Sequence, residues 1–244
     1  MDKPTLNATA GIASLWMEVS GHRVHYLKSG SGPAVLLLHG GASDSRDWLP
    51  TMAALSGRYT FYAPDIIGFG LSQRKDSGYY LDEFTEFAVE LIDKLGLERP
   101  ALAGHSFGAR VGLDVALLHP EKLSKLVMVD AAGLGRVSRM GSALQTGLWG
   151  LRQVLHRRQP YPRFLNREYD DPSWACLEEL PSLKTPTLII WKSHDPYLPI
   201  ANGRQAARLI PGARLEVLPG WGHAPHRSKN GVFVGLLADF LDSK

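Results

Sequence analysis

Short, uninterrupted apolar runs recur along this chain and alternate with longer stretches in which apolar residues return every three or four positions. A short apolar run is typical of a strand buried on both faces, and the longer pattern predicts amphipathic helices. The predicted strands of this kind are Val35–Leu38, Phe61–Ala63, Ala101–Ala103, Leu126–Val129, Leu188–Trp191 and, last, Arg214–Leu218. The alternation favours a mostly parallel sheet with helices on both faces, which is the α/β class.

The start of the chain has a different pattern. Leu15–Val19 and Val24–Lys28 are joined by a short turn at residues 20–22, which predicts an antiparallel hairpin. The predicted helices are Leu81–Leu95, Val111–Leu118 and Val232–Leu241. Together these segments predict a central sheet of about eight strands, flanked by helices.

The interval between Gly133 and Pro186 breaks the alternation, because it has helical spacing and prolines but no convincing strand. We interpret residues 134–185 as a helical cap inserted into a core domain of residues 1–133 and 186–244. One predicted helical face of this interval carries Leu144, Leu148, Leu151 and Leu155. Six arginines and no acidic residue lie between positions 134 and 166. Two interpretations stay open: a basic lid over a pocket, and a helix resting on a membrane surface.

Composition narrows the class of protein. Of the 244 residues, 44% are hydrophobic, enough for a sizeable core in a single domain. The single cysteine, Cys176, cannot form an internal disulfide, which fits a reducing compartment. The chain shows neither a signal-peptide pattern nor an apolar run of membrane-spanning length, so we expect a cytoplasmic protein without stable membrane insertion. A formal net charge of +3 does not indicate nucleic-acid binding.

The strongest chemical signal is a G-x-S-x-G sequence at residues 104–108, between an apolar strand and a predicted helix. The turn that this context requires is very tight, and Gly104 and Gly108 remove side chains that would collide with it. Ser106 then stands exposed above the sheet, next to helix N-terminal amides that stabilise a developing oxyanion. The pattern therefore predicts a nucleophilic serine.

In motifs and in element order the chain resembles the α/β-hydrolase superfamily, specifically its serine esterases, here with a short cap. The resemblance implies that Asp195 and His223, in loops after the last two predicted strands, complete a catalytic triad with Ser106. His223 would take the serine proton during attack and return it to the leaving alcohol, and Asp195 would orient the imidazole. Asp130 is a rival acid, because some members draw theirs from the end of the preceding strand.

The resemblance also implies an oxyanion hole made of the backbone amides of Gly41 and Phe107. Gly41 belongs to an HG-containing loop in which His39 is expected to be a structural anchor. The loop that begins at Asp65 resembles a D-x-x-G-x-G-x-S segment of structural character. The candidate pocket residues are Gly40, Trp48, His105, Arg110, Trp149 and Trp221.

Two further histidines, His194 and His226, are expected to be non-catalytic, since His223 alone occupies the matched position. The chain departs from many relatives at Ala109, where they carry a second glycine, and at Arg227, where they carry an acidic residue. The second departure puts in doubt details of the His223 loop rather than the triad.

The leading functional interpretation is a carboxylesterase that acts on a small-molecule ester without cofactor or metal, as a monomer or homodimer. One alternative is a C–C bond hydrolase or a lyase of the menaquinone-pathway type, because Arg110 matches an arginine of that lyase's motif and cap arginines could clamp a carboxylate. The other alternative is a non-catalytic ligand receptor of the same fold. Acyl chain length and leaving group are not readable from the sequence.

Overall fold

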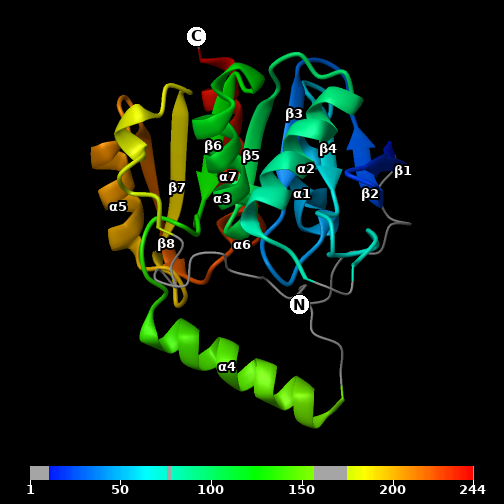
Figure 1. Ribbon diagram of the computed structural model, residues 1–244. Helices are drawn as coiled ribbons and strands as arrows, with labels where there is room; N and C mark the ends of the chain where they lie inside the picture. The colour runs from blue at the N-terminus through cyan, green and yellow to red at the C-terminus, as the bar shows by residue number, and fades with distance from the viewer. Residues whose placement is uncertain (1–10, 76–77, 157–174, 244) are drawn as a thin grey trace.

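The computed structural model describes residues 11–75, 78–156 and 175–243, and its centre is an eight-stranded sheet in the order β1-β2-β4-β3-β5-β6-β7-β8 (Figure 1). The strands are β1 Ile12–Val19, β2 His22–Ser29, β3 Ala34–Leu38, β4 Thr60–Pro64, β5 Ala101–His105, β6 Lys125–Val129, β7 Thr187–His194 and β8 Arg214–Trp221. The helices are α1 Leu49–Leu55, α2 Leu81–Lys94, α3 Phe107–Leu118, α4 Arg139–Val154, α5 Ile200–Leu209, α6 Pro225–Ser228 and α7 Asn230–Asp242, with short 3-10 helices at Ser45–Trp48, Pro120–Lys122 and Leu180–Ser182.

Strand pairing confirms the predicted mostly parallel sheet. β1 and β2 form the expected antiparallel hairpin, β2 pairs antiparallel with β4, and every later neighbour in the sheet is parallel. The hairpin turn has φ +50° at Ser20 and +69° at Gly21, and two consecutive positive φ values suit the right-handed twist of the strands. All predicted strands are therefore present.

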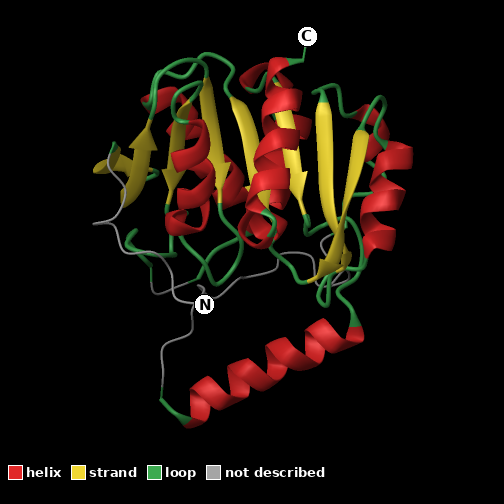
Figure 2. Ribbon diagram, turned by 180° about the vertical axis from the view of Figure 1, so that it is seen from behind, coloured by secondary structure: helices red, strands yellow, loops and turns green. Residues whose placement is uncertain are grey.

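Alternate residues of the parallel strands supply two separate cores. On β3, Leu36 and Leu38 pack in one cluster, whereas Val35 and Leu37 pack in the other. Helices α2, α3 and α5 cover the first face of the sheet, and α1 and α7 cover the second (Figures 1 and 2). Because both faces are covered, the parallel strands need continuous apolar sequence, which is the pattern that predicted them.

The interval after β6 differs from the expected cap in its second part. In Figures 1 and 2, α4 is a separate helix that stands away from the sheet and its covering helices. Residues 157–174, which the predicted cap includes, lie outside the described residues. The stretch after residue 174 packs against the core of the sheet. Its side chains Cys176, Leu180 and Leu183 belong to the same hydrophobic cluster as Leu36 and Leu38.

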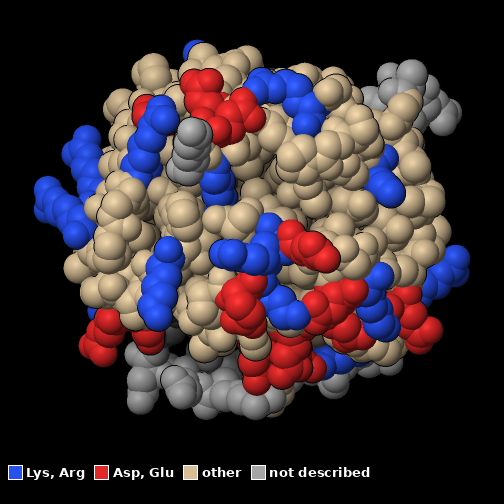
Figure 3. All heavy atoms as spheres, turned by 90° about the horizontal axis from the view of Figure 1, so that it is seen from above, with Lys and Arg blue, Asp and Glu red and all other residues tan. Residues whose placement is uncertain are grey.

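Charged side chains of both signs intermix on the face at the amino ends of the parallel strands (Figure 3). Ion pairs such as Lys122 with Asp93 and Arg58 with Asp242 lie on exposed surface. Among the described residues, no helix has the length and apolarity needed to cross a bilayer.

Candidate active site

Ser106 occupies the junction between β5 and α3, and its backbone is strained. Its φ and ψ are +50° and −110°, a conformation that a residue with a side chain rarely adopts. The Ser106 amide donates to the Val129 carbonyl at 2.9 Å, and the Ser106 carbonyl accepts from the amide of Ala132 at 3.1 Å. These bonds to β6 and to the loop after it hold the strained residue in place.

The two flanking glycines are required by close backbone contacts. A Cβ atom at Gly104 would lie 2.5 Å from the backbone nitrogen of Ala109, and one at Gly108 would lie 2.5 Å from the carbonyl oxygen of His39. Real Cβ contacts are not this short, so any larger residue would force the strand-to-helix turn apart. The steric reason given for the G-x-S-x-G spacing therefore holds in the structure.

Substituting Gly108 with alanine is expected to lower the free energy of unfolding by about 1–3 kcal/mol, because a methyl group must displace the loop after β3. Gly235→Ala is the matched control: Gly235 is exposed in α7, and a Cβ atom added there would have nothing within 4 Å. That change should raise the free energy of unfolding by about 0.5–1 kcal/mol. Urea denaturation measures both, and equal effects of the two substitutions would contradict the argument.

The structure brings together the three side chains predicted from far-apart segments. The Ser106 hydroxyl lies 2.9 Å from Nε2 of His223, and Nδ1 of His223 lies 2.5 Å from Oδ2 of Asp195. The Asp195 side chain is fully buried, whereas that of His223 is 21% exposed. Such a chain of contacts can pass a proton from the hydroxyl to the imidazole while the carboxylate stabilises the resulting charge.

Both oxygens of Asp195 have partners, which keeps the carboxylate in one orientation. Oδ1 accepts from the amides of Tyr197 at 2.7 Å and Leu198 at 3.1 Å, so Oδ2 is left for His223. The loop is also tied to the start of α4, because the Ser138 amide donates to the Tyr197 carbonyl at 2.7 Å. The segment leading into α4 is thus anchored on the loop that carries the acid.

The loop after β3 lies against the nucleophile. A Cβ atom at Gly40 would be 2.6 Å from Nδ1 of His105 and 3.3 Å from Cβ of Ser106. His39 holds this loop as expected: its Nε2 accepts from the amide of Ile66 at 3.0 Å, and its Nδ1 donates to the Gly40 carbonyl at 2.8 Å. Burial lowers the pKa of His39, which agrees with a neutral ring in that tautomer.

Two of the predicted pocket residues do not line an open pocket. Trp48 is fully buried and packs on the rings of His226 and Phe233, with centroids 4.6 and 6.1 Å apart. Arg110 is 9% exposed, and its Nε donates to both carboxylate oxygens of Asp114. Core packing therefore surrounds the indole, and a buried ion pair holds the Nε of Arg110.

The other predicted pocket residues lie at different distances along the fold from the nucleophile. Gly40 and His105 adjoin Ser106, while Trp221, 66% exposed, ends β8 two residues before His223. Trp149 is 49% exposed on α4, which stands apart from the body of the protein (Figure 1).

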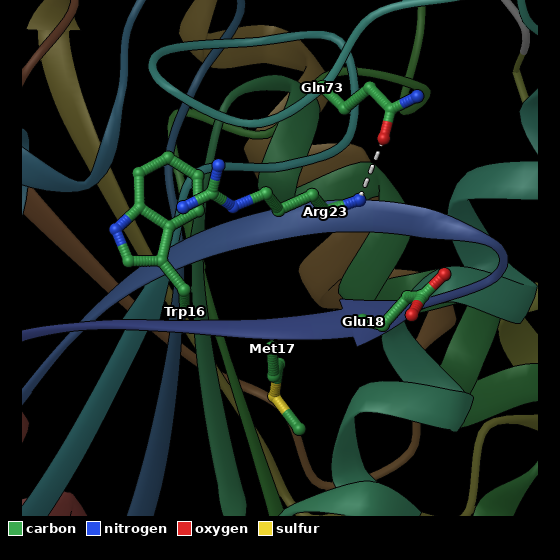
Figure 4. A pocket seen from close by; sticks show the side chains of 5 residues that line it. All are labelled: Trp16, Met17, Glu18, Arg23 and Gln73. Carbon is green, nitrogen blue, oxygen red and sulfur yellow. Dashed lines mark hydrogen bonds between the residues drawn. The ribbon is translucent and has the colours of Figure 1, made fainter.

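A hollow of about 320 Å³ opens at the opposite edge of the sheet, on the β1–β2 hairpin (Figure 4). Its lining residues are Trp16, Met17, Glu18, Arg23 and Gln73. The Arg23 guanidinium lies 4.3 Å from the centroid of the Trp16 ring. None of the triad candidates reaches this hollow, so we assign it no part in the candidate site.

Asp130, the rival acid, lies close to the site without replacing Asp195. Its carboxylate has an oxygen within 4.8 Å of ring nitrogens of His105 and His223, and its Oδ1 accepts from the Lys192 amide at 2.8 Å. The residue is fully buried, and burial raises the pKa of its carboxyl to about 7. The geometry thus favours Asp195 as the direct partner of His223.

The raised pKa of Asp130 makes stability depend on pH. Below about pH 3 the carboxyl is protonated in both states, and above pH 7 the folded protein must ionise a buried group that ionises freely when unfolded. Stability is therefore lost as pH rises from about 4 to 7, by on the order of 4 kcal/mol. Asp130→Asn keeps the Oδ1 acceptor, and its stability relative to wild type should increase as pH rises from about 4 to 7 and be greatest at pH 8, by urea denaturation. A stability difference that does not change with pH, or one shared by the exposed control Asp239→Asn, would show that the pH dependence does not come from the buried Asp130 carboxyl.

The contacts that several residues make at the site could not be read from the sequence. The centroid of the Tyr197 ring lies 5.3 Å from that of His223, and the rings of His226 and His105 lie at a tilt with centroids 4.5 Å apart. Burial lowers the pKa of His226 to about 3. Arg227, at the position where relatives carry an acid, has Nη1 3.4 Å from Oδ1 of Asp47. Arg227 thus pairs with an acidic residue of the short helix before α1.

Comparison with known proteins agrees with this architecture. Residues 35–236 match the model of the Alpha/beta hydrolase family. A 2-hydroxymuconate semialdehyde hydrolase from Pseudomonas sp. (strain CF600) is 26% identical over an alignment of 277 residues. The alignment covers 97% of this chain and 97% of that enzyme.

Two solved structures show the same fold. A carboxylesterase from Bacillus subtilis superposes with a TM-score of 0.85 at 22% identity, covering 96% of this chain and 92% of the other. A meta-cleavage product hydrolase from Pseudomonas fluorescens IP01 gives a TM-score of 0.77 at 23% identity, covering 93% and 97%. At these identities the structures establish the architecture and leave the substrate open.

Proposed function

Because the chain belongs to the alpha/beta hydrolase family, we propose that it is a serine hydrolase that cleaves small carboxylic esters through an acyl-enzyme. The resemblance inferred from the sequence motifs is confirmed by the family match. The observation that carries the proposal is the continuous contact from Ser106 through His223 to Asp195, at 2.9 and 2.5 Å.

Each side chain has one role in the proposed reaction. A serine hydroxyl is a weak nucleophile at neutral pH, so His223 Nε2 accepts its proton as Oγ attacks the ester carbonyl. The same nitrogen then donates that proton to the leaving alcohol, which gives the acyl-enzyme. Water, deprotonated by His223, attacks the acyl group and releases the acid, and Asp195 stabilises the imidazolium in both halves.

The oxyanion of each tetrahedral intermediate would be bound by the backbone amides of Gly41 and Phe107. Phe107 is the first residue of α3, where helix amides point outward and the helix dipole favours negative charge. Gly41 follows Gly40, which lies against Ser106. Donors of this kind contribute about 3 kcal/mol each to transition-state stabilisation.

We also propose that α4 is the lid of this site. The support is the anchoring of its first turn: Ser138 caps the helix by accepting from the Gly141 amide, and its own amide bonds to Tyr197 in the acid loop. A lid hinged there would control which esters reach Ser106.

The second candidate function is C–C bond hydrolysis of a carboxylate-bearing substrate. It is favoured by the end-to-end likeness to the 2-hydroxymuconate semialdehyde hydrolase. Arg110, whose motif match also suggested this reaction, has its Nε in a buried ion pair with Asp114. Ester hydrolysis therefore remains the leading proposal.

A panel of p-nitrophenyl esters from two to sixteen carbons, run beside a meta-cleavage dienoic acid, tests these proposals together. We expect turnover of the shorter esters that is absent in Ser106→Ala. Consumption of the dienoic acid without ester turnover would favour the C–C hydrolase. Saturable ester binding with no turnover of any substrate would favour the non-catalytic receptor.

A further inference from the structure

Three buried side chains that the proposed reaction does not use meet beside the nucleophile. Asp47 comes from the 3-10 helix before α1, His105 from the end of β5, and His226 from α6. One potential ligand atom of each residue lies within 4.8 Å of those of the other two. All three residues are at least nine-tenths buried, with 4%, 6% and 0% exposure.

Several polar atoms of these three residues lack hydrogen-bond partners among the described residues. Nδ1 of His105, both ring nitrogens of His226 and Oδ1 of Asp47 have none there, although Oδ1 of Asp47 is in an ion pair with Arg227 at 3.4 Å. Buried polar atoms are nearly always paired, so three ring nitrogens that the described part of the chain leaves unpartnered in one place call for a ligand. Hydrophobic packing alone would not select two imidazoles and a carboxylate here.

The tautomer of His105 is assigned by its other nitrogen. Nε2 lies 2.5 Å from the carbonyl oxygen of His223, and a carbonyl can only accept, so the proton is on Nε2. Nδ1 therefore carries a lone pair and is the nitrogen of His105 that is free to bind a ligand. A histidine that donates one ring N–H to a backbone carbonyl while the other nitrogen binds is the usual arrangement around protein-bound metal ions. Asp47 has the equivalent support, because its Oδ2 accepts from the Ser43 hydroxyl.

We propose that Asp47, His105 and His226 form a binding site for a zinc ion. Two imidazole nitrogens and one carboxylate oxygen are a common protein ligand set for this ion, with a water molecule as the fourth ligand. Arg227, whose side chain is 33% exposed, can swing into solvent and release Oδ1 of Asp47 to the metal.

The position of the site indicates that the ion would position the loops around the nucleophile. His105 precedes Ser106 in the chain and also donates to the carbonyl of His223, and His226 lies three residues after His223. A metal ion here would join the strand-to-helix turn, the His223 loop and the helix before α1. It polarises the His105 ring and strengthens its bond to the His223 carbonyl, without touching the reacting atoms.

Metal binding by the full-length Ser106→Ala protein tests this site independently of any hydrolase activity. Isothermal titration with zinc chloride after chelator treatment should give one saturable site per chain, and a hundredfold excess over Kd should raise Tm by about 5 °C or more. Cobalt(II) should give the visible absorption band of a four-coordinate ion. No saturable zinc binding and no cobalt band would overturn the proposal.

Two variants locate the site within the protein. His226→Phe keeps an aromatic ring against Trp48 and removes both nitrogens, and Asp47→Asn removes the charged ligand oxygen. Each should weaken zinc binding at least a hundredfold, whereas the partly exposed control His119→Gln should bind as wild type does. Unchanged affinity in the first two folded variants, or loss in the control, would assign the metal to another place and overturn the proposal. The cobalt band of the parent protein serves as the test if either variant does not fold.

Discussion

Ser106→Ala is expected to lower kcat for a short p-nitrophenyl ester by about a millionfold, to the level that binding and oxyanion stabilisation alone provide. The reason is chemical, because alanine has no group that can form the acyl-enzyme. The substitution removes one oxygen from an already strained residue and leaves its backbone bonds to Val129 and Ala132 in place, so the fold should be unaffected. Stopped assays at high enzyme concentration measure the residual rate.

The matched control is Ser228→Ala, an exposed serine whose hydroxyl bonds only within its own helical turn. It should retain wild-type kcat. Retention of more than a few per cent of kcat in Ser106→Ala, with an unchanged Tm, would remove Ser106 from the reaction.

Asp195→Asn is expected to lower kcat by about ten thousandfold while Tm changes little. An asparagine keeps the Oδ1 acceptor for the amides of Tyr197 and Leu198. Its amide group, however, can donate to Nδ1 of His223, which places the ring proton on Nε2. That nitrogen then cannot accept the proton of Ser106.

The same substitution at Asp130 distinguishes the two acids. Asp130→Asn should lower kcat by less than tenfold, since His223 has its direct bond to Asp195 and the pKa of the Asp130 carboxyl is raised to about 7 by burial. If Asp130→Asn were the more damaging of the two, the acid assignment would pass to the end of β6. Steady-state kinetics on both variants decides the question.

The strands and the tight turn at Ser106 could be predicted from sequence because their signals are local. A parallel strand covered on both faces must be apolar along its length, and a turn this tight needs glycine at fixed positions. Helix α5 gave no such signal, because the residues it buries are Asn202, Gly203 and Ala206 rather than large apolar ones. Helix α1 is only seven residues long, too short for a clear periodicity.

Side-chain partners could not be predicted, because they come from segments far apart in the chain. Trp48 packs on His226 and Phe233, and nothing near position 48 identifies those neighbours. Arg110 has its partner one helical turn away in Asp114, but only the burial of that pair makes it a fixed structural contact. The buried cluster of Asp47, His105 and His226 was missed for the same reason.

The most direct test of the central claim is to treat the protein with a fluorophosphonate and locate the adduct by peptide mass spectrometry. An activated serine reacts with this probe, so we expect one adduct per chain, on the peptide containing Ser106, and no adduct in His223→Ala. An adduct on a different residue, or none in a protein that hydrolyses esters, would contradict the assignment of Ser106 as the nucleophile.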